Sequence, residues 1–231
     1  MTPEKTAALQ LVLSADPTLL SIVSLSLQVT LTATLLAGII GAPIGAFIAL
    51  HRFPAREPVI IALNALMGLP PVVVGLATYL ALSRSGPLGS WGILFTPAAM
   101  VIAQTVLVTP FIAALTRQTI EDLWVEYREE FAAMEVGPLQ RVSALIWDAR
   151  FSLVTALLAG FGRAAAEVGA IIIVGGNIEG FTRTMTTTIA LETSKGNLSL
   201  AIGLGIVLMV IVVSVSALAW AVRRAGERMS G

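Results

Sequence analysis

Two charged residues stand inside a long apolar run of this chain, where they are the side chains best placed to act on a polar solute. Arg163 and Glu167 lie four positions apart, and in a helix that spacing puts both side chains on one face, one turn apart. Because a charge at membrane depth costs a few kcal/mol, such residues pair with neighbours or face water. With the nearby Gly169, the pattern predicts either a gate or pathway for a polar solute or a purely structural ion pair.

The chain carries no pattern for enzymatic chemistry. It has no cysteine and a single histidine, His51, so it offers no zinc or haem site and no hydrolase triad. Its lysines are Lys5 and Lys195, and neither belongs to a phosphate-binding P-loop. The chain is therefore not expected to be a P-loop ATPase itself, and no cofactor is expected in it. A formal net charge of zero gives no electrostatic case for nucleic acid.

The elements that must position these residues are five apolar windows. With 56% hydrophobic and 12% charged residues, the chain has the composition of a membrane protein. Each window approaches or exceeds the roughly 20 residues that cross a bilayer as a helix. The windows are residues 22–50, 59–82, 97–115, 151–174 and 198–222. We predict an all-α, polytopic membrane protein of about five transmembrane helices in one domain, residues 1–231, rather than a helical hairpin buried in a large soluble protein.

A charged, amphipathic insert, residues 121–150, separates the third and fourth windows. Gly137-Pro138 suits the residue past the end of one helix and the first position of the next. A compact helix-turn-helix of this kind is typical of a surface offered to a soluble partner. Aromatic and apolar residues recur at heptad spacing on one face of its first helix, namely Trp124, Tyr127, Phe131 and Met134.

Basic residues predict the orientation of the chain in the membrane. With five spans the termini lie on opposite sides, and the positive-inside rule assigns the more basic side to the cytoplasm. One side holds Arg52, Arg56, Arg117, Arg128, Arg141, Arg150, Arg223, Arg224 and Arg228, and the other holds Lys5, Arg84, Arg183 and Lys195. We therefore expect the N-terminus outside and the C-terminus and the insert in the cytoplasm.

Prolines and glycines interrupt two of the windows. Pro70 and Pro71 lack backbone donors, so the second window must kink or break near its cytoplasmic third. Such a break fits either a static kink or a place beside a translocation path. Gly41 and Gly45, in the first window, have the spacing of a close helix contact, which we expect within the subunit rather than between copies.

A hydroxyl-rich segment follows the fourth window and lies outside in this orientation. Two interpretations of it stand side by side. In the first, its hydroxyls and cations act on the substrate route, where they meet a substrate-delivering protein or line the mouth of an anion route. In the second, it is a short helix, capped by threonine and ended by Gly196, that lies on the outer surface. The residues singled out are Asn177, Arg183, Thr186, Thr187 and Thr188.

The insert resembles the EAA loop of ABC-importer permeases, whose pattern is Glu-Ala-Ala-x-x-x-Gly followed later by Ile-x-Leu-Pro. Ala132, Ala133 and Gly137 match this pattern in register. Phe131 stands where glutamate is usual, and Ala149-Arg150 replaces Leu-Pro. Other stretches resemble the molybdate/tungstate branch of type I importers, and the last is most similar to tungstate permeases: Gly68–Gly75, Gly162–Ala170, Val174–Gly180 and Thr182–Gly196.

The resemblance implies a type I ABC importer permease fold (MetI-like) in the cell membrane. The implied partners are a second copy of the chain, two cytoplasmic ATPase subunits and an extracytoplasmic oxyanion-binding protein. The implied substrate is a tetrahedral oxyanion, tungstate first, with molybdate or another oxyanion as the alternative. The residues that would couple to the ATPase are Tyr127, Glu130, Phe131, Ala132, Ala133, Gly137, Val142 and Ile146.

Two other classes of protein share some of these features. One is a membrane adaptor whose insert recruits a cytoplasmic enzyme, and the other is a passive anion channel. The broken second window and the intramembrane charges favour transport over the adaptor. The docking insert favours an ATP-coupled importer over the channel.

Overall fold

The computed structural model describes residues 12–14 and 16–229, and this part of the chain is helical and contains no strand. The prediction of an all-α protein is confirmed. Lys5, which entered the predicted orientation, lies outside the described residues. The elements in chain order are α2 (Pro17–Leu50), α3 (Arg56–Met67), α4 (Pro71–Leu82), the 3-10 helix η1 (Gly89–Trp91), α5 (Pro97–Ala133), α6 (Pro138–Ala165), α7 (Gly169–Gly175), α8 (Met185–Lys195) and α9 (Leu198–Met229).

Proline and short polar side chains begin the helices. Proline stands in the first turn of α2, α4, α5 and α6, where its missing N–H would have had no helical partner. Asp16 caps α2, because its carboxylate accepts hydrogen bonds from the backbone N–H groups of Thr18 at 2.9 Å and Leu19 at 3.2 Å. The sequence thus sets where the long helices start.

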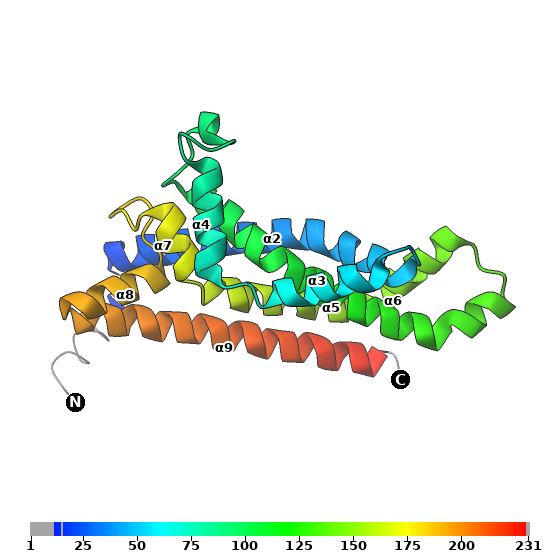
Figure 1. Cartoon of the computed structure of the whole chain (residues 1–231). Coiled ribbons are helices and arrows are strands. Elements are labelled where there is room, and N and C mark those ends of the chain that lie inside the picture. Colours follow the sequence, from blue (N-terminus) through cyan, green and yellow to red (C-terminus); the bar gives the residue numbers. More distant parts are fainter. Residues whose placement is uncertain (1–11, 15, 230–231) are drawn as a thin grey trace.

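The long helices α2, α5, α6 and α9 lie side by side along one direction, and α4 stands across them (Figure 1). Glycines bring α2 onto α5: a Cβ on Gly41 would lie 2.7 Å from the carbonyl oxygen of Thr109, and one on Gly45 would clash with Ala113. Gly45 comes four residues after Gly41, and its contact Ala113 comes four residues after Thr109, so the two helices run in parallel. The close contact predicted within the subunit is confirmed.

The second apolar window is not a straight span. Its two halves, α3 and α4, meet at an angle of 99° across the break at Gly68–Pro70. Two consecutive prolines explain why the turn is so sharp, since neither can donate a helical hydrogen bond. Since α2 and α5 run in parallel, the chain between them must return to the end of the bundle where α2 begins. Residues 51–96 therefore cross the bundle by a bent route, and the described part holds four continuous candidate spans or five with this pair.

Two of the helices do not end where the predicted apolar windows end. The third window was expected to end at residue 115, but α5 continues without interruption to Ala133 and carries the first half of the insert. The fourth window, residues 151–174, is split between α6 and α7 by a break at 166–168. Window averages of hydropathy detect the apolar stretch and not the helix ends, because the backbone hydrogen bonds continue into charged residues.

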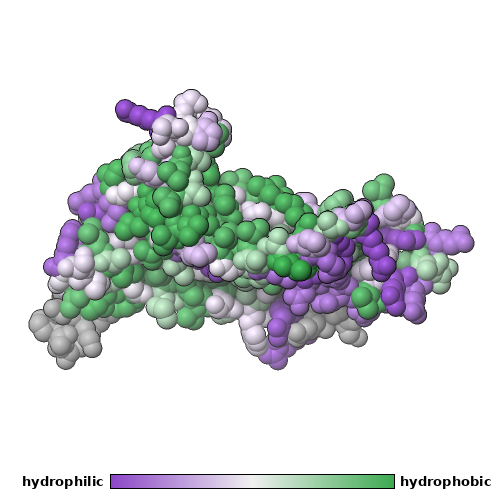
Figure 2. Space-filling model, in the orientation of Figure 1, coloured by the Kyte–Doolittle hydropathy of each residue, from purple (hydrophilic) through white to green (hydrophobic). Residues whose placement is uncertain are grey.

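The surface has the hydropathy pattern of a chain that spans a bilayer. Apolar residues cover the middle of the molecule, and hydrophilic residues gather at the end that carries the α5–α6 turn (Figure 2). Large apolar side chains such as Ile39 on α2 and Met209 and Val213 on α9 are exposed, which soluble domains avoid in such numbers. The chain is a multi-pass membrane protein.

Candidate functional site

The insert is a helical hairpin, residues 121–150, that projects from one end of the bundle (Figure 1). Its turn begins after Ala133, where the N–H of Met134 bonds to the carbonyl of Glu130 at 2.9 Å. The left-handed residue of the turn is Glu135, with φ +50°, and Pro138 begins α6 as predicted. Gly137 precedes α6 as its cap with φ −69°, so the expectation that it closes the first helix was wrong.

The aromatic face of the hairpin packs inside the protein. The ring of Phe131 lies 6.4 Å from that of Trp124 and 6.0 Å from that of Tyr127, measured between centroids. These rings cover a buried cluster that includes Ile120 on α5 and Leu145 on α6. Three of the four residues of the heptad face, Trp124, Tyr127 and Phe131, therefore join the two arms of the hairpin.

The side chains that the hairpin offers to solvent are different ones. Met134 is 74% exposed and Leu139 is 85% exposed, on either side of the turn. Glu130, Ala132 and Ala133, which precede Met134 at the end of α5, are exposed as well. Large apolar side chains at the polar end of a membrane protein indicate a docking surface. Sequence reasoning did not select Met134 or Leu139 as coupling residues, although Met134 stood in the heptad pattern.

The other predicted coupling residues lie at the base of the hairpin. Val142 is half-buried and Ile146 is 43% exposed, and both line a cavity between α6 and α2. Close by, Glu121 binds Arg56 of α3 at 2.6 Å and Arg117 of its own helix. Arg56 also donates to the carbonyl of Ile48 on α2 at 3.0 Å. These bonds tie the base of the hairpin to both α2 and α3.

The two helix breaks pack against one another in the middle of the bundle. A Cβ on Gly75 of α4 would lie 2.8 Å from the Cα of Ala170 on α7, and one on Gly169 would lie 2.8 Å from the side chain of Val72. Pro70, exposed, and Pro71, half-buried, start α4 at this contact. The structure thus brings four of the five predicted gate residues to one place.

Glu167 belongs to this place, but not as an ion-pair partner of Arg163. Its carboxylate accepts a hydrogen bond from the N–H of Ala170 at 3.1 Å, and its carbonyl accepts one from the Thr186 hydroxyl at 2.7 Å. The predicted spacing assumed a continuous helix, whereas α6 ends at Ala165. No ion pair joins Arg163 to Glu167 in the described part of the chain.

Arg163 is the basic residue that lies within the apolar segments of the chain. No other lysine or arginine lies in residues 17–50, 71–82, 97–116, 151–175 or 198–222. Its guanidinium carbon lies 5.7 Å from the ring centroid of Phe111, and its buried Nε has no hydrogen-bond partner. Next to it along α6, the Ala164 carbonyl accepts a bond from Gln104 at 3.0 Å, and the Oε1 of Gln104 is also buried and unpartnered. The open Arg163 donor suits water or a passing anion, whereas the open Gln104 oxygen, an acceptor, suits water.

The hydroxyl-rich segment folds as the capped-helix interpretation expects. Thr187 caps α8 by accepting a bond from the N–H of Thr184 at 3.0 Å, Thr188 donates to the Thr184 carbonyl at 2.6 Å, and Gly196 ends the helix with φ +80°. All three of Thr186, Thr187 and Thr188 are buried. Their hydroxyls serve the fold and do not face the protein surface.

Arg183 and Asn177 lie closer to that surface. Arg183 forms a 3.4 Å ion pair with Glu179 and donates to the carbonyl of Asn177 at 3.4 Å. Arg183 and Glu179 also line a cavity of about 420 Å³ against the start of α2. Because Glu179 offsets its charge, Arg183 is not free to attract an anion in this state.

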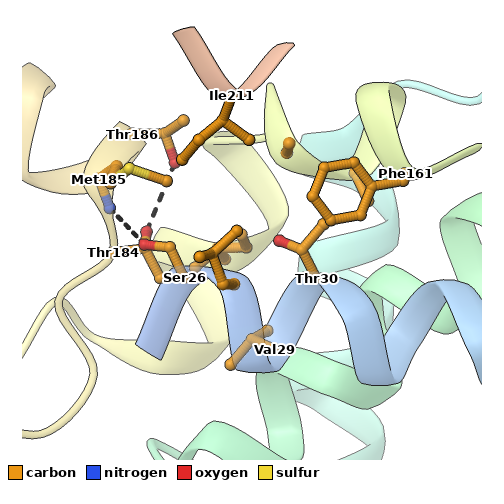
Figure 3. Close-up of a pocket in the computed structure, with 12 residues that line it drawn as sticks. Ser26, Val29, Thr30, Phe161, Thr184, Met185, Thr186 and Ile211 are labelled. Atoms are coloured by element: carbon orange, nitrogen blue, oxygen red, sulfur yellow. Dashed lines mark hydrogen bonds between the residues drawn. The ribbon is translucent and has the colours of Figure 1, made fainter. Parts of the chain in front are cut away.

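A much smaller cavity lies beneath the segment, lined by α2, α6, α7, α9 and the start of α8 (Figure 3). Ser26, Thr30, Thr184 and Thr186 reach it, and the N–H of Met185 bonds to the Ser26 hydroxyl at 2.7 Å. Its volume of about 10 Å³ is that of one water molecule, so it does not hold an oxyanion. In the described residues no group of three or more His, Cys, Asp or Glu is placed to hold a metal ion.

Fold and site together define a polytopic helical membrane protein with a projecting hairpin, and comparison with known proteins gives its family. No protein-family model matches the chain. A probable anion ABC transporter permease of Haloferax volcanii is 41% identical over 187 residues, 78% of this chain and 80% of the relative. The tungstate uptake system permease protein TupB of Peptoclostridium acidaminophilum is 39% identical over 191 residues, 83% of this chain and 84% of the relative. The chain belongs to the family of ABC transporter permeases.

The solved structures agree on the fold. The permease chain in inward-facing conformations of the MetNI methionine ABC transporter superposes with a TM-score of 0.75 at 18% identity, over 90% of this chain and 96% of that one. The expected MetI-like fold and the expected family are confirmed. As in its relatives, the chain is a transport subunit.

Proposed function

We propose that this chain is the membrane-spanning permease of an ATP-driven importer of tungstate. The observation that carries the proposal is the 39% identity to a tungstate uptake permease over 83% of the chain. Tungstate is a tetrahedral dianion, and an intramembrane arginine without a carboxylate partner is consistent with the passage of an anion. Because the sequence has no P-loop, ATP and magnesium bind to a separate ATPase, and this chain holds no cofactor.

The assembly contains two copies of the chain, two cytoplasmic ATPase subunits and an external oxyanion-binding protein. The hairpin end of the bundle faces the cytoplasm, and the N-terminus lies outside. This orientation is supported by the positive-inside rule, since Arg52, Arg56 and Arg117 accompany the hairpin at one end. The C-terminal arginines belong to the same end, because Gly226 of α9 packs on Phe151 near the base of the hairpin.

The hairpin is the coupling element. Its exposed tip, Met134 and Leu139, docks in a groove of the ATPase, and its packed aromatic interior moves as one body. Closure of the ATPases on ATP displaces the hairpin, and with it α5, which is the same continuous helix. The bond from Glu121 to Arg56 passes the displacement to α3, and so to the break at Pro70 and Pro71.

The gate lies where the two breaks meet. The backbones of α4 and α7 are in close contact there, at Gly75 and Ala170. Because α4 follows α3 in the chain, a shift of α3 must separate α4 from α7 or slide one along the other. Pro70, Pro71, Glu167 and Gly169 shape this contact, with Glu167 holding the start of α7. Arg163 lines the pathway, where its positive charge lowers the free energy of an anion in the membrane interior.

The test is uptake of labelled tungstate into proteoliposomes that contain the permease, the ATPase and the binding protein. We expect uptake only with all three proteins and ATP, and weaker competition by molybdate than by unlabelled tungstate. Uptake without ATP or the ATPase would show a passive channel instead. Binding of the ATPase with no uptake of tungstate, molybdate or sulfate would show an adaptor.

A further inference from the structure

An open apolar cavity of about 370 Å³ lies between α2, α5 and α6 at the base of the hairpin. Pro43, Ala46 and Leu50 of α2 form one wall, and Val142 and Ile146 of the hairpin form the opposite wall. Its size is within the range of small-molecule sites. Water gains few hydrogen bonds against such walls, so the cavity favours an apolar occupant.

The surroundings place this cavity at the boundary between the membrane and the aqueous phase. Trp147 is 69% exposed, and the guanidinium of Arg150 lies 4.6 Å from its ring centroid. Exposed tryptophan beside arginine is typical of the level of the lipid headgroups. An acyl chain is the apolar molecule present there at high concentration.

The charged side chain next to the cavity lining is a cation. His51 belongs to the lining, stacked on Phe47 with centroids 4.4 Å apart, and its Nδ1 lies 3.1 Å from the Phe47 carbonyl. The next residue, Arg52, is exposed and forms no ion pair in the described part of the chain. No aspartate or glutamate lines the cavity.

We propose that the cavity binds an anionic phospholipid, with one acyl chain between α2 and the hairpin and the phosphate against Arg52. The apolar walls select the chain, and the unpaired guanidinium of Arg52 selects the negative headgroup. Because the two walls belong to α2 and to the hairpin, the bound lipid fills the space through which the base of the hairpin would move. Lipid composition then acts directly on coupling.

The experiment uses the full chain in nanodiscs with a photoactivatable acyl chain on an anionic or a zwitterionic phospholipid. We expect labelling of residues 42–51 and 142–153, with about fivefold more from the anionic lipid. Ala46→Trp, which fills the cavity, should abolish this labelling, and Leu218→Trp on the exposed face of α9 should leave it unchanged.

A second variant keeps the test independent of folding. Arg52→Gln changes an exposed side chain and should remove the preference for the anionic lipid while the cavity is still labelled. Equal labelling of Ala46→Trp and wild type would overturn the proposal. So would an absence of lipid labels in the wild type, whether the cavity is empty or covered by a second copy or by the ATPase.

Discussion

The exposed tip of the hairpin gives the sharpest prediction. Replacing Met134 and Leu139 together with serine removes two large apolar side chains that are 74% and 85% exposed in the permease alone. Since neither packs on the rest of the chain, the free energy of unfolding should change by no more than about 0.5 kcal/mol. If the ATPase groove buries both, each truncation loses about 1.5 kcal/mol of transfer free energy. The sum, about 3 kcal/mol, corresponds to roughly a hundredfold weaker affinity.

The assay is a titration of the purified ATPase onto the permease in nanodiscs, with tungstate uptake measured on the same variants. Leu13→Ser is the matched control, because Leu13 is 83% exposed but lies before α2, at the other end of the bundle. We expect wild-type affinity for the control and the hundredfold loss for the double variant. Wild-type affinity and uptake in the double variant would refute the assignment of the tip as the docking surface.

Four further predictions concern packing, coupling, the pathway and pH. Gly45→Ala places a Cβ against the backbone of Ala113 and should cost about 1–3 kcal/mol in thermal unfolding, whereas Gly205→Ala meets nothing within 4 Å and should not destabilise the protein. Phe131→Ala removes the ring that packs on Trp124 and Tyr127. Hydrogen exchange in the hairpin should therefore rise, and substrate-stimulated ATP hydrolysis should fall. Unchanged exchange would contradict this packing. Arg163→Gln should lower tungstate uptake roughly tenfold or more while basal ATP hydrolysis stays intact. Arg163→Lys, which keeps the charge, should retain part of the uptake. Normal uptake in the glutamine variant would show that Arg163 does not contribute to the pathway. Hydrogen bonds from Asn197 and Lys195 lower the pKa of Glu192 below its ordinary 4.5, so the stability they give is complete above that value and is lost as pH falls through the lowered pKa. The amide protection factors at 192–197, which are corrected for the intrinsic effect of pH on exchange, should therefore fall in that acid range in the wild type and not in Glu192→Gln.

The sequence predicts the family, the helical class and the apolar stretches, because hydropathy and the EAA-like pattern are properties of short segments. It could not say what covers the aromatic face of the insert. Heptad spacing shows that Tyr127 and Phe131 need an apolar partner, and the structure supplies it from α6 rather than from another protein. A lone leucine after a proline carries no periodic signal, so Leu139 was not selected.

The intramembrane charges show a second limit. The four-residue spacing of Arg163 and Glu167 predicts a shared face only if the helix is continuous, and no proline or glycine between them signals the break at 166–168. That break depends on tertiary contacts: Glu167 bonds to the N–H of Ala170 and to Thr186, which is distant in the sequence. The threonine cluster was ambiguous for the same reason, since hydroxyls suit both a ligand and a helix cap.

The central claim is that the ATPase holds the hairpin of this permease. The chain has no cysteine, so Leu139→Cys and Leu13→Cys each create a unique site for a short crosslinker. In membranes that transport tungstate, we predict a crosslink from position 139 to the ATPase that changes in yield when ATP binds, and none from position 13. A crosslink from position 13, or none from position 139 while uptake continues, would contradict the account.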